Sequence, residues 1–188
     1  MRTDSLFFDR QKQEVYYQTT GEITSEDTVI RSQSGTYVVD DKKYEFISDV
    51  VVTDPSFTIF SQRMDYYSDV RHAYFYGATT INGEEYDVFC NRGFFDSNLK
   101  KGYFQDRATV DYNLKNIKGD SIYFDDHIQY AAATRNVQIT DTIGNNVIRG
   151  EYGEVFKDKD SAIVTQNPIA IKLVDRDSLY ILSLIHIS

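Results

Sequence analysis

The stretch Ala73-Tyr74-Phe75-Tyr76-Gly77-Ala78-Thr79-Thr80-Ile81 decides how this chain folds, because it is one copy of a repeat. The same alternation of residues behind a polar turn begins at positions 15, 44, 73, 102, 131 and 162. These starts are 29 residues apart, except for the last, which follows after 31. A fixed period near 30 residues is typical of proteins built from stacked structural units. We therefore interpret the chain as a repeat protein.

The composition indicates strands and not helices. The chain has 15 Tyr and 12 Phe but no Trp and only two Pro, and its apolar segments are rich in aromatic and β-branched residues. No window shows the apolar spacing of an amphipathic helix. Each repeat reads as two strands joined by a polar turn, with a second turn leading onward. The sequence predicts an all-β fold: a jelly roll of about six stacked antiparallel hairpins, each of ~30 residues.

Alternation of side chains along each strand separates an inner from an outer face. One parity is mostly apolar, as in Phe46, Val50 and Val52, and the other is mostly polar. The middle residue of the apolar parity is polar or small in every copy, which predicts a bulge that turns this position outward. Strands bent in this way are expected to fold over into two facing sheets or a flattened roll. The middle residues are Thr19, Ser48, Gly77, Asp106, Arg135 and Gln166.

The apolar rows predict an interior that continues from repeat to repeat and could hold an alkyl chain. For any single residue, packing that joins the repeats is the favoured interpretation. For the rows as a whole, we predict a lipid-binding interior. Its residues are Phe8, Tyr17, Ile23, Val39, Tyr44, Phe46, Val50, Val52, Tyr67, Phe75, Ile81, Phe95, Phe104, Val110, Phe124, Val137 and Ile139.

Charge and residue spacing argue against several other functions. The net charge of −9 and pI near 4.8 disfavour nucleic-acid binding. His72, His127 and His186 are far apart and are expected in solvent, and Cys90 is expected to be a small buried residue. We therefore predict no catalytic residues, no metal and no cofactor. The arginines are interpreted as surface residues, with contact to lipid phosphates as the alternative: Arg63, Arg92, Arg107, Arg135 and Arg149.

The repeated motif resembles the LptA/OstA-like family. The motif Asp-Ser-(Leu/Ile)-(Tyr/Phe)-Phe-Asp is clearest at 120–125, and the companion pattern Asn-Val-x-Ile-x-Asp is clearest at 136–141. The resemblance covers residues 4–181 and is strongest to OstA-like proteins of Bacteroidetes-type bacteria. It implies a periplasmic, non-enzymatic β-jelly roll that binds lipopolysaccharide acyl chains in its interior. It also implies partners at the ends of the roll, either other Lpt-type proteins or further copies joined by strand addition.

The resemblance further predicts that residues 1–181 form one continuous roll and are a fragment of a longer chain. Residues 182–188 depart from the pattern and are interpreted as a non-native tail or, alternatively, as an edge strand. A different class of function is also compatible with the repeat: a structural scaffold or surface adhesin with a filled interior and no lipid cargo. A carbohydrate-active β-helix enzyme would require a carboxylate cluster on one exposed face.

Overall fold

The computed structural model describes residues 2–25, 27–112, 114–144, 146–174 and 177–182, and all of its regular elements are strands. Of the tail expected at 182–188, residues 183–188 lie outside this range. The strands are β1 (Phe7–Asp9), β2 (Glu14–Tyr17), β3 (Gly21–Ser25), β4 (Thr28–Ser32), β5 (Ser34–Val38), β6 (Lys43–Asp54), β7 (Phe57–Tyr67), β8 (His72–Gly83), β9 (Tyr86–Asp96), β10 (Lys101–Tyr112), β11 (Lys115–Asp125), β12 (Tyr130–Asp141), β13 (Asn146–Phe156), β14 (Ser161–Thr165), β15 (Ile169–Val174) and β16 (Asp177–Leu182).

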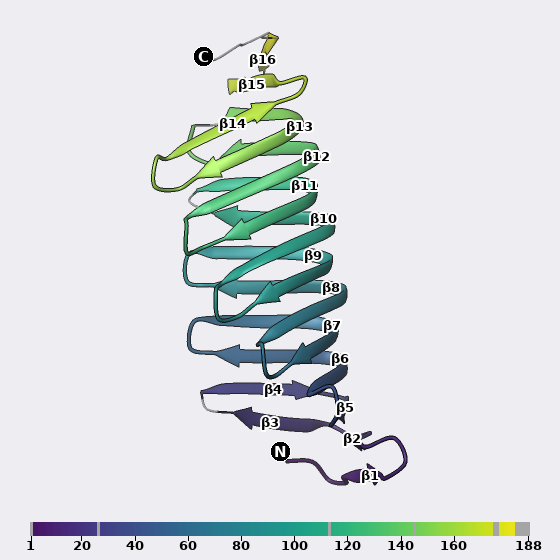
Figure 1. The fold of residues 1–188 in the computed structure, drawn as a ribbon. Helices are drawn as coiled ribbons and strands as arrows, with labels where there is room; N and C mark the ends of the chain where they lie inside the picture. The colour runs from purple at the N-terminus through teal and green to yellow at the C-terminus, as the bar shows by residue number, and fades with distance from the viewer. Residues whose placement is uncertain (1, 26, 113, 145, 175–176, 183–188) are drawn as a thin grey trace.

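The strands form one antiparallel sheet in which neighbours in sequence are mostly neighbours in space. The hydrogen-bonded path runs β1-β2-β5-β6 and then in sequence order to β13, β15 and β16. Figure 1 shows the result: hairpins stacked along one axis, with β1 and β16 at opposite ends of the stack. The predicted all-β fold of stacked hairpins is confirmed. Among the described residues, no helix is long and apolar enough to cross a membrane.

Every long strand bends near its middle, so that the sheet folds over into two layers (Figure 1). In β6, residues Ser48 and Asp49 have φ values of 61° and 52°. The ladder between β6 and β7 shifts there, between Ile47 and Val50, as expected of a bulge. The predicted outward bend in the middle of the strand is confirmed. The same left-handed conformation recurs at Gly77, Asp106, Arg107, Arg135, Asn136, Gln166 and Asn167.

The repeats at the two ends are cut into shorter strands at this bend. Residues 14–25 occupy the place that β6 occupies one repeat later, but they form two strands, β2 and β3. Residues 28–38 correspond in the same way to β7 and form β4 and β5. Near the C-terminus, β14 and β15 divide at Gln166 and Asn167, which both have positive φ.

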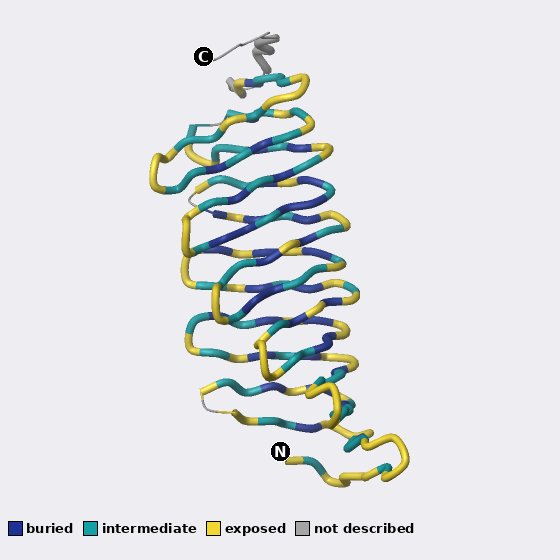
Figure 2. Tube along the Cα trace, in the orientation of Figure 1, coloured by how far each residue is buried: buried dark blue, intermediate teal, exposed yellow. Residues whose placement is uncertain are grey.

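The hydrophobic core lies between the two layers and extends along the stack, from Ile30 in β4 to Val155 in β13. Figure 2 shows buried residues in the middle of the strands and exposed residues at the turns and at the N-terminal end. The core therefore joins successive repeats, as the alternation of the strands predicts.

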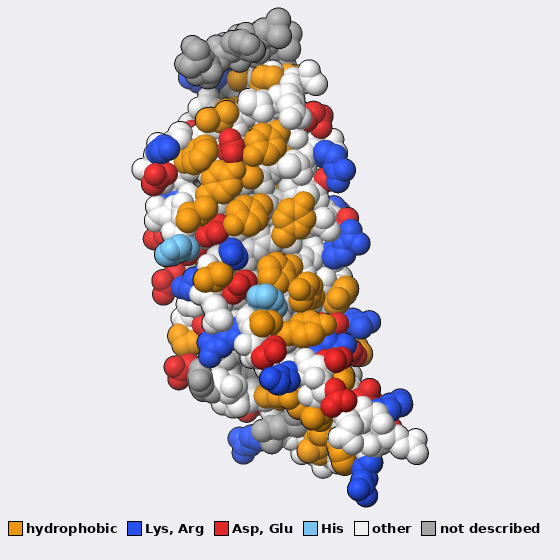
Figure 3. All heavy atoms as spheres, viewed as in Figure 1, with side chains coloured by type: hydrophobic (Ala, Val, Ile, Leu, Met, Phe, Trp, Pro, Cys, Tyr) orange, Lys and Arg blue, Asp and Glu red, His pale blue; other side chains and the backbone are white. Residues whose placement is uncertain are grey.

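The outer surface also carries aromatic residues. Figure 3 shows hydrophobic side chains gathered along the middle of one face of the stack, with charged side chains between them and toward its margins. Tyr67 and Phe94 each pack against Tyr74 on the outside of the sheet, with ring centroids 5.7 and 5.1 Å apart. These cross-strand pairs explain the aromatic outer positions of the stretch 73–81, because facing rings stabilise a sheet.

Turns at one edge are joined to each other by a ladder of hydrogen bonds. The backbone N–H of Ser97 donates to the carbonyl of Arg71 at 3.2 Å, and Ser68 and Asp126 donate in the same way to the preceding turn. Arg71, like its counterparts in the other turns, has a positive φ, here 56°, which presents its carbonyl to the next repeat. The turns therefore continue the stacking that the strands begin.

Candidate functional site

A cavity of about 330 Å³ lies between the layers in the N-terminal half of the stack. Such a volume is at the lower end of the range for small-molecule sites, ~300–1,000 Å³. Strands β3, β4 and β6 to β9 contribute its walls. The apolar lining consists of Ile23, Ile30, Tyr44, Phe46, Val52, Phe57, Ile59, Met64, Tyr66, Ala73 and Phe95.

Polar residues line the same cavity where the strands end in turns. From one layer come Ser25, Thr28 and Asp54, at the end of β3, the start of β4 and the end of β6. From the turns of the other layer come Ser68, Arg71 and Ser97. We call these six residues the mouth. The cavity therefore has an apolar floor toward the bend and a mouth with both signs of charge on the opposite side.

Asp54 is held at the mouth by its neighbours. Its carboxylate accepts hydrogen bonds from Thr28 Oγ1 at 2.8 Å, Ser56 Oγ at 2.9 Å and the Ser56 N–H at 3.0 Å. Burial raises the pKa of Asp54, but these hydrogen bonds and the charge of Lys100 outweigh burial and hold the pKa below its usual value. The mouth therefore carries a fixed negative charge at neutral pH.

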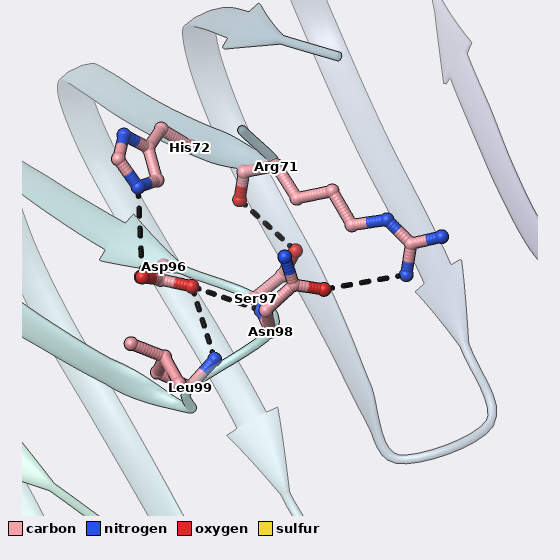
Figure 4. Close-up of polar contacts among 6 residues, drawn as sticks. All are labelled: Arg71, His72, Asp96, Ser97, Asn98 and Leu99. Atoms are coloured by element: carbon pink, nitrogen blue, oxygen red, sulfur yellow. Dashed lines mark hydrogen bonds and ion pairs between the residues drawn. The ribbon is translucent and has the colours of Figure 1, made fainter. Parts of the chain in front are cut away.

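The opposite side of the mouth is fixed by the turn ladder shown in Figure 4. The Arg71 guanidinium donates to Asn98 Oδ1 at 3.4 Å, and the Arg71 backbone carbonyl accepts a hydrogen bond from Ser97 Oγ at 3.1 Å. Asp96 Oδ1 accepts the N–H groups of Asn98 and Leu99, both at 3.0 Å. These contacts position Arg71 and Ser97 by backbone geometry, so the mouth is preformed.

Aromatic rings fill the corresponding space in the next repeats. The Phe57 and Phe95 rings meet in the gap between the layers, with their centroids 5.5 Å apart. They close the cavity on its C-terminal side. Behind them, the Phe124 ring packs against Tyr86 at 4.8 Å and Tyr112 at 5.1 Å. We call Tyr86, Tyr112 and Phe124 the aromatic block. All three are buried, with at most 5% of each residue exposed.

The repeat period shows why one half is hollow and the other filled. In successive repeats, the position at the end of the strand is Ser25, Asp54, Gly83 and then Tyr112. The first two side chains are short and the glycine has none, whereas the Tyr112 ring reaches Phe124. Beyond it, Lys157 lies over the Tyr112 ring at 5.2 Å and pairs with Glu85, which closes this half at the turns.

A second hollow of about 330 Å³ lies at the turns of β8 to β12, and Tyr86 and Tyr112 of the block are among its lining residues. Charged and polar turn residues, including Glu84, Asp87, Asp111 and Lys115, make up much of its lining. It lacks the apolar floor of the first cavity. Within the described residues, no group of histidine, cysteine and acidic side chains is arranged to hold a metal ion.

The structure divides the residues predicted to line the interior into three groups. Five line the cavity: Ile23, Tyr44, Phe46, Val52 and Phe95. Another group is buried between the layers but does not line the cavity: Tyr17, Val50, Phe75, Ile81, Phe104, Val110, Phe124, Val137 and Ile139. The remaining three, Phe8, Val39 and Tyr67, do not lie in the interior.

The prediction of an interior position is wrong for these three residues, for different reasons. Phe8 is in register with the inward column, since it pairs with Val15, but it lies in the terminal strand and is 55% exposed. Val39 follows the last residue of β5 and is 39% exposed in the turn. Tyr67 is one residue out of register, and its ring packs against Tyr74 on the outer face.

Sequence reasoning missed the cavity residues of the return strand. Phe57 and Ile59 are 6% and 2% exposed and line the cavity, but the interior prediction included neither residue. A signal was present, because Phe57 and Ile59, at alternate positions of one strand, recur one period later as Tyr86 and Val88. Residues at the mouth, such as Asp54 and Arg71, gave no such signal, since turns are polar in any soluble protein.

The two described histidines and Cys90 have different surroundings. His72 is only half-exposed, and its Nε2 lies 3.5 Å from Asp96 Oδ2 (Figure 4). His127 is exposed in a turn, and His186 lies outside the described residues. Cys90 is fully buried, as predicted, and burial raises the pKa of its thiol to about 12.

The predicted surface position of the arginines agrees with their ion pairs. Arg92 Nε lies 3.5 Å from Asp106 Oδ2, and Arg135 Nε lies 3.5 Å from Asp120 Oδ2. Both arginine side chains are more than half exposed, near the bend of the strands. They therefore do not line the cavity.

The fold and the cavity define a β-repeat protein of bent, stacked hairpins with a hollow apolar interior at one end. Residues 1–62 match the family model described as OstA-like protein, which confirms over those residues the resemblance found in the sequence. No curated protein matches the chain. Among solved structures, the chain is similar to LptH of Pseudomonas aeruginosa, described as the LptA homologous periplasmic component of the conserved lipopolysaccharide transport device. The two are 14% identical, with a TM-score of 0.31 over 84% of this chain and 85% of that one.

Proposed function

We propose that this protein is a non-enzymatic carrier that holds an acyl chain of lipopolysaccharide in the cavity and acts in a periplasmic transport bridge. The observation that carries the proposal is a preformed cavity with an apolar floor and a polar, charged mouth. This arrangement suits an amphipathic ligand whose hydrocarbon chain enters and whose head group stays outside. The match of residues 1–62 to the OstA-like family supports the choice of lipid class.

The volume supports a single short chain. At ~30 Å³ for a group the size of a water molecule, 330 Å³ holds about eleven such groups. Burial of that many methylene groups stabilises the complex by about 9 kcal/mol, before the entropic cost of binding is subtracted. The alternative function, a scaffold or adhesin without lipid, is favoured by the filled interior from Tyr86 onward.

Neighbouring residues on opposite faces of β7 allow a direct test. Ile59 lines the cavity and is 2% exposed, whereas Phe60 points outward and is 49% exposed. A photocrosslinking amino acid placed at Ile59 should form an adduct with lipopolysaccharide after irradiation, and one at Phe60 should not. Circular dichroism would establish that both variants are folded. Equal adducts at the two positions, or none at Ile59 in a folded protein, would contradict binding in the interior.

A further inference from the structure

The cavity ends abruptly within a stack whose repeats otherwise continue. Phe57 and Phe95 line its C-terminal wall, and the strands beyond β9 contribute none of its lining. Behind this wall the aromatic block occupies the same place between the layers, with the Phe124 ring in contact with both tyrosines. A chain that enters at the mouth therefore meets a wall of packed rings.

Tyr86 occupies a distinctive position behind this wall, in the aromatic block. Its ring lies over Gly83, because a Cβ atom built on that glycine would come within 2.5 Å of the ring. Its hydroxyl is buried and has no hydrogen-bond partner in the described part of the chain. A buried hydroxyl without a partner destabilises the fold. The ring is therefore placed by its shape between the layers and not by a polar contact.

Neighbouring repeats show that a tyrosine at this level is not required by the fold. The equivalent position in successive repeats is held by Thr28, Phe57, Tyr86 and Lys115. Only the first two line the cavity, and the filled half begins at Tyr86. At this column the cavity thus ends between Phe57 and Tyr86, which stand one repeat apart.

We infer that Tyr86 and the rings packed behind it act as a stop that limits the length of the acyl chain this protein accepts. This inference rests on the proposed function, and it assigns Tyr86 as the residue that determines chain-length specificity. The bound acyl chain lies between the layers formed by β3, β4 and β6 to β9, and it does not pass into the C-terminal half. The limit is a chain of about eleven carbons beyond the head group, from the cavity volume of about 330 Å³.

Saturated fatty acids of increasing length provide the test, through displacement of a fluorescent fatty acid from the full chain. Each methylene that enters the cavity should raise affinity about fourfold. In the wild-type protein the affinity should rise up to about twelve carbons, the carboxyl carbon included, and then stop rising. In Tyr86→Val, which replaces the ring with a small β-branched apolar side chain, the rise should continue to longer chains, with a gain of at least tenfold for a 16-carbon acid.

Two controls separate the stop from general loosening of the core. Tyr86→Phe retains the ring and should keep the wild-type limit. Ile139→Val removes one methylene from the buried core farther along the stack, away from the cavity, and should also keep it. If Tyr86→Val does not fold, Tyr86→Leu tests the same loss of the ring.

The outcomes distinguish this inference from the proposed function. Affinity that rises without limit in the wild type, or an unchanged limit in folded Tyr86→Val, overturns the stop but leaves acyl-chain binding intact. Absence of binding for every chain length, together with absence of a lipopolysaccharide adduct at Ile59, overturns both.

Discussion

The two halves of the stack follow the same period and the same bend, yet one is hollow and the other filled. Phe95 and Phe124 stand one repeat apart, hold equivalent places and are both fully buried. The first forms a wall of the cavity, and the second contacts two tyrosine rings. The comparison shows that the fold does not determine whether its interior is available to a ligand. A few side chains at the strand ends decide that.

Truncation of these two phenylalanines should show the largest difference in stability between the two halves. Phe124→Ala is expected to lower the free energy of unfolding by ~4 kcal/mol, because it leaves a large void among packed rings. Phe95→Ala should cost about 1 kcal/mol less, since a ring beside a cavity lacks contacts on one side. Urea denaturation of both variants measures the difference. Equal losses would show that the N-terminal half is packed as tightly as the other.

Alkaline pH should affect the boundary between the halves. Cys90 lies there, where Ser61 stands one repeat earlier. Burial raises the pKa of the Cys90 thiol from 9.0 to about 12 in the folded state. Between these pH values the unfolded chain loses a proton that the folded chain retains, so stability falls as pH rises. The loss should reach ~2.5 kcal/mol at pH 11.

Chemical denaturation between pH 8 and 11 measures this loss. The Cys90→Ala variant is the control and should lose less stability over the same range. Tyrosines with raised pKa, such as Tyr86, contribute a decline of the same sign in both proteins. Identical pH profiles for the two proteins would contradict the assignment to Cys90.

Gly83 should prove sensitive because the Tyr86 ring covers it. In Gly83→Ala the new methyl group would come within 2.5 Å of that ring, which is packed in the aromatic block. Displacement of the ring is expected to cost ~2 kcal/mol. Thermal unfolding of Gly83→Ala and of Gly83→Ala combined with Tyr86→Val measures the conflict. The second change should offset much of the first, and strictly additive losses would contradict the contact.

The ion pairs that close the filled half should matter least. Lys115 Nζ lies 2.5 Å from Asp160 Oδ1, but the aspartate side chain is 81% exposed. Exposed pairs contribute at most ~1 kcal/mol and are screened by salt. Asp160→Asn should therefore lower stability by less than ~1 kcal/mol in low salt and by a smaller amount in concentrated NaCl. A loss that does not change with salt would indicate a role other than charge.

Much of the fold can be predicted from sequence because the repeat averages out local ambiguity. The inward parity is correct for Phe46, Phe75 and Phe104, and the bend is correctly placed at Ser48 and Asp106. A polar residue that recurs at one position of an apolar row is typical of a bulge, which makes this signal specific. The residues wrongly predicted to lie in the interior are confined to the chain terminus and to the ends of strands, where composition follows the pattern.

The cavity itself could not be predicted in this way. Its existence depends on which residue stands at one position of the repeat: Asp54 and Gly83 leave the gap between the layers open, and Tyr112 fills it. It also depends on how far each side chain reaches across that gap. Alternation predicts which side of a strand faces inward, but not the volume left between two inward faces. The mouth was likewise hidden, because Arg71 and Ser97 come together only through hydrogen bonds between consecutive turns.

The ladder of turns has a consequence for how the molecule comes apart. Each repeat is bonded to the one before and the one after, through paired strands and through contacts such as Ser97 to Arg71. A structure with only nearest-neighbour contacts behaves as a one-dimensional zipper, which frays from its ends inward. Amide protons of β1 should then exchange with solvent long before those of β10. The hollow half lies toward the N-terminal end, where fraying begins, so a ligand bound there would also oppose this local unfolding.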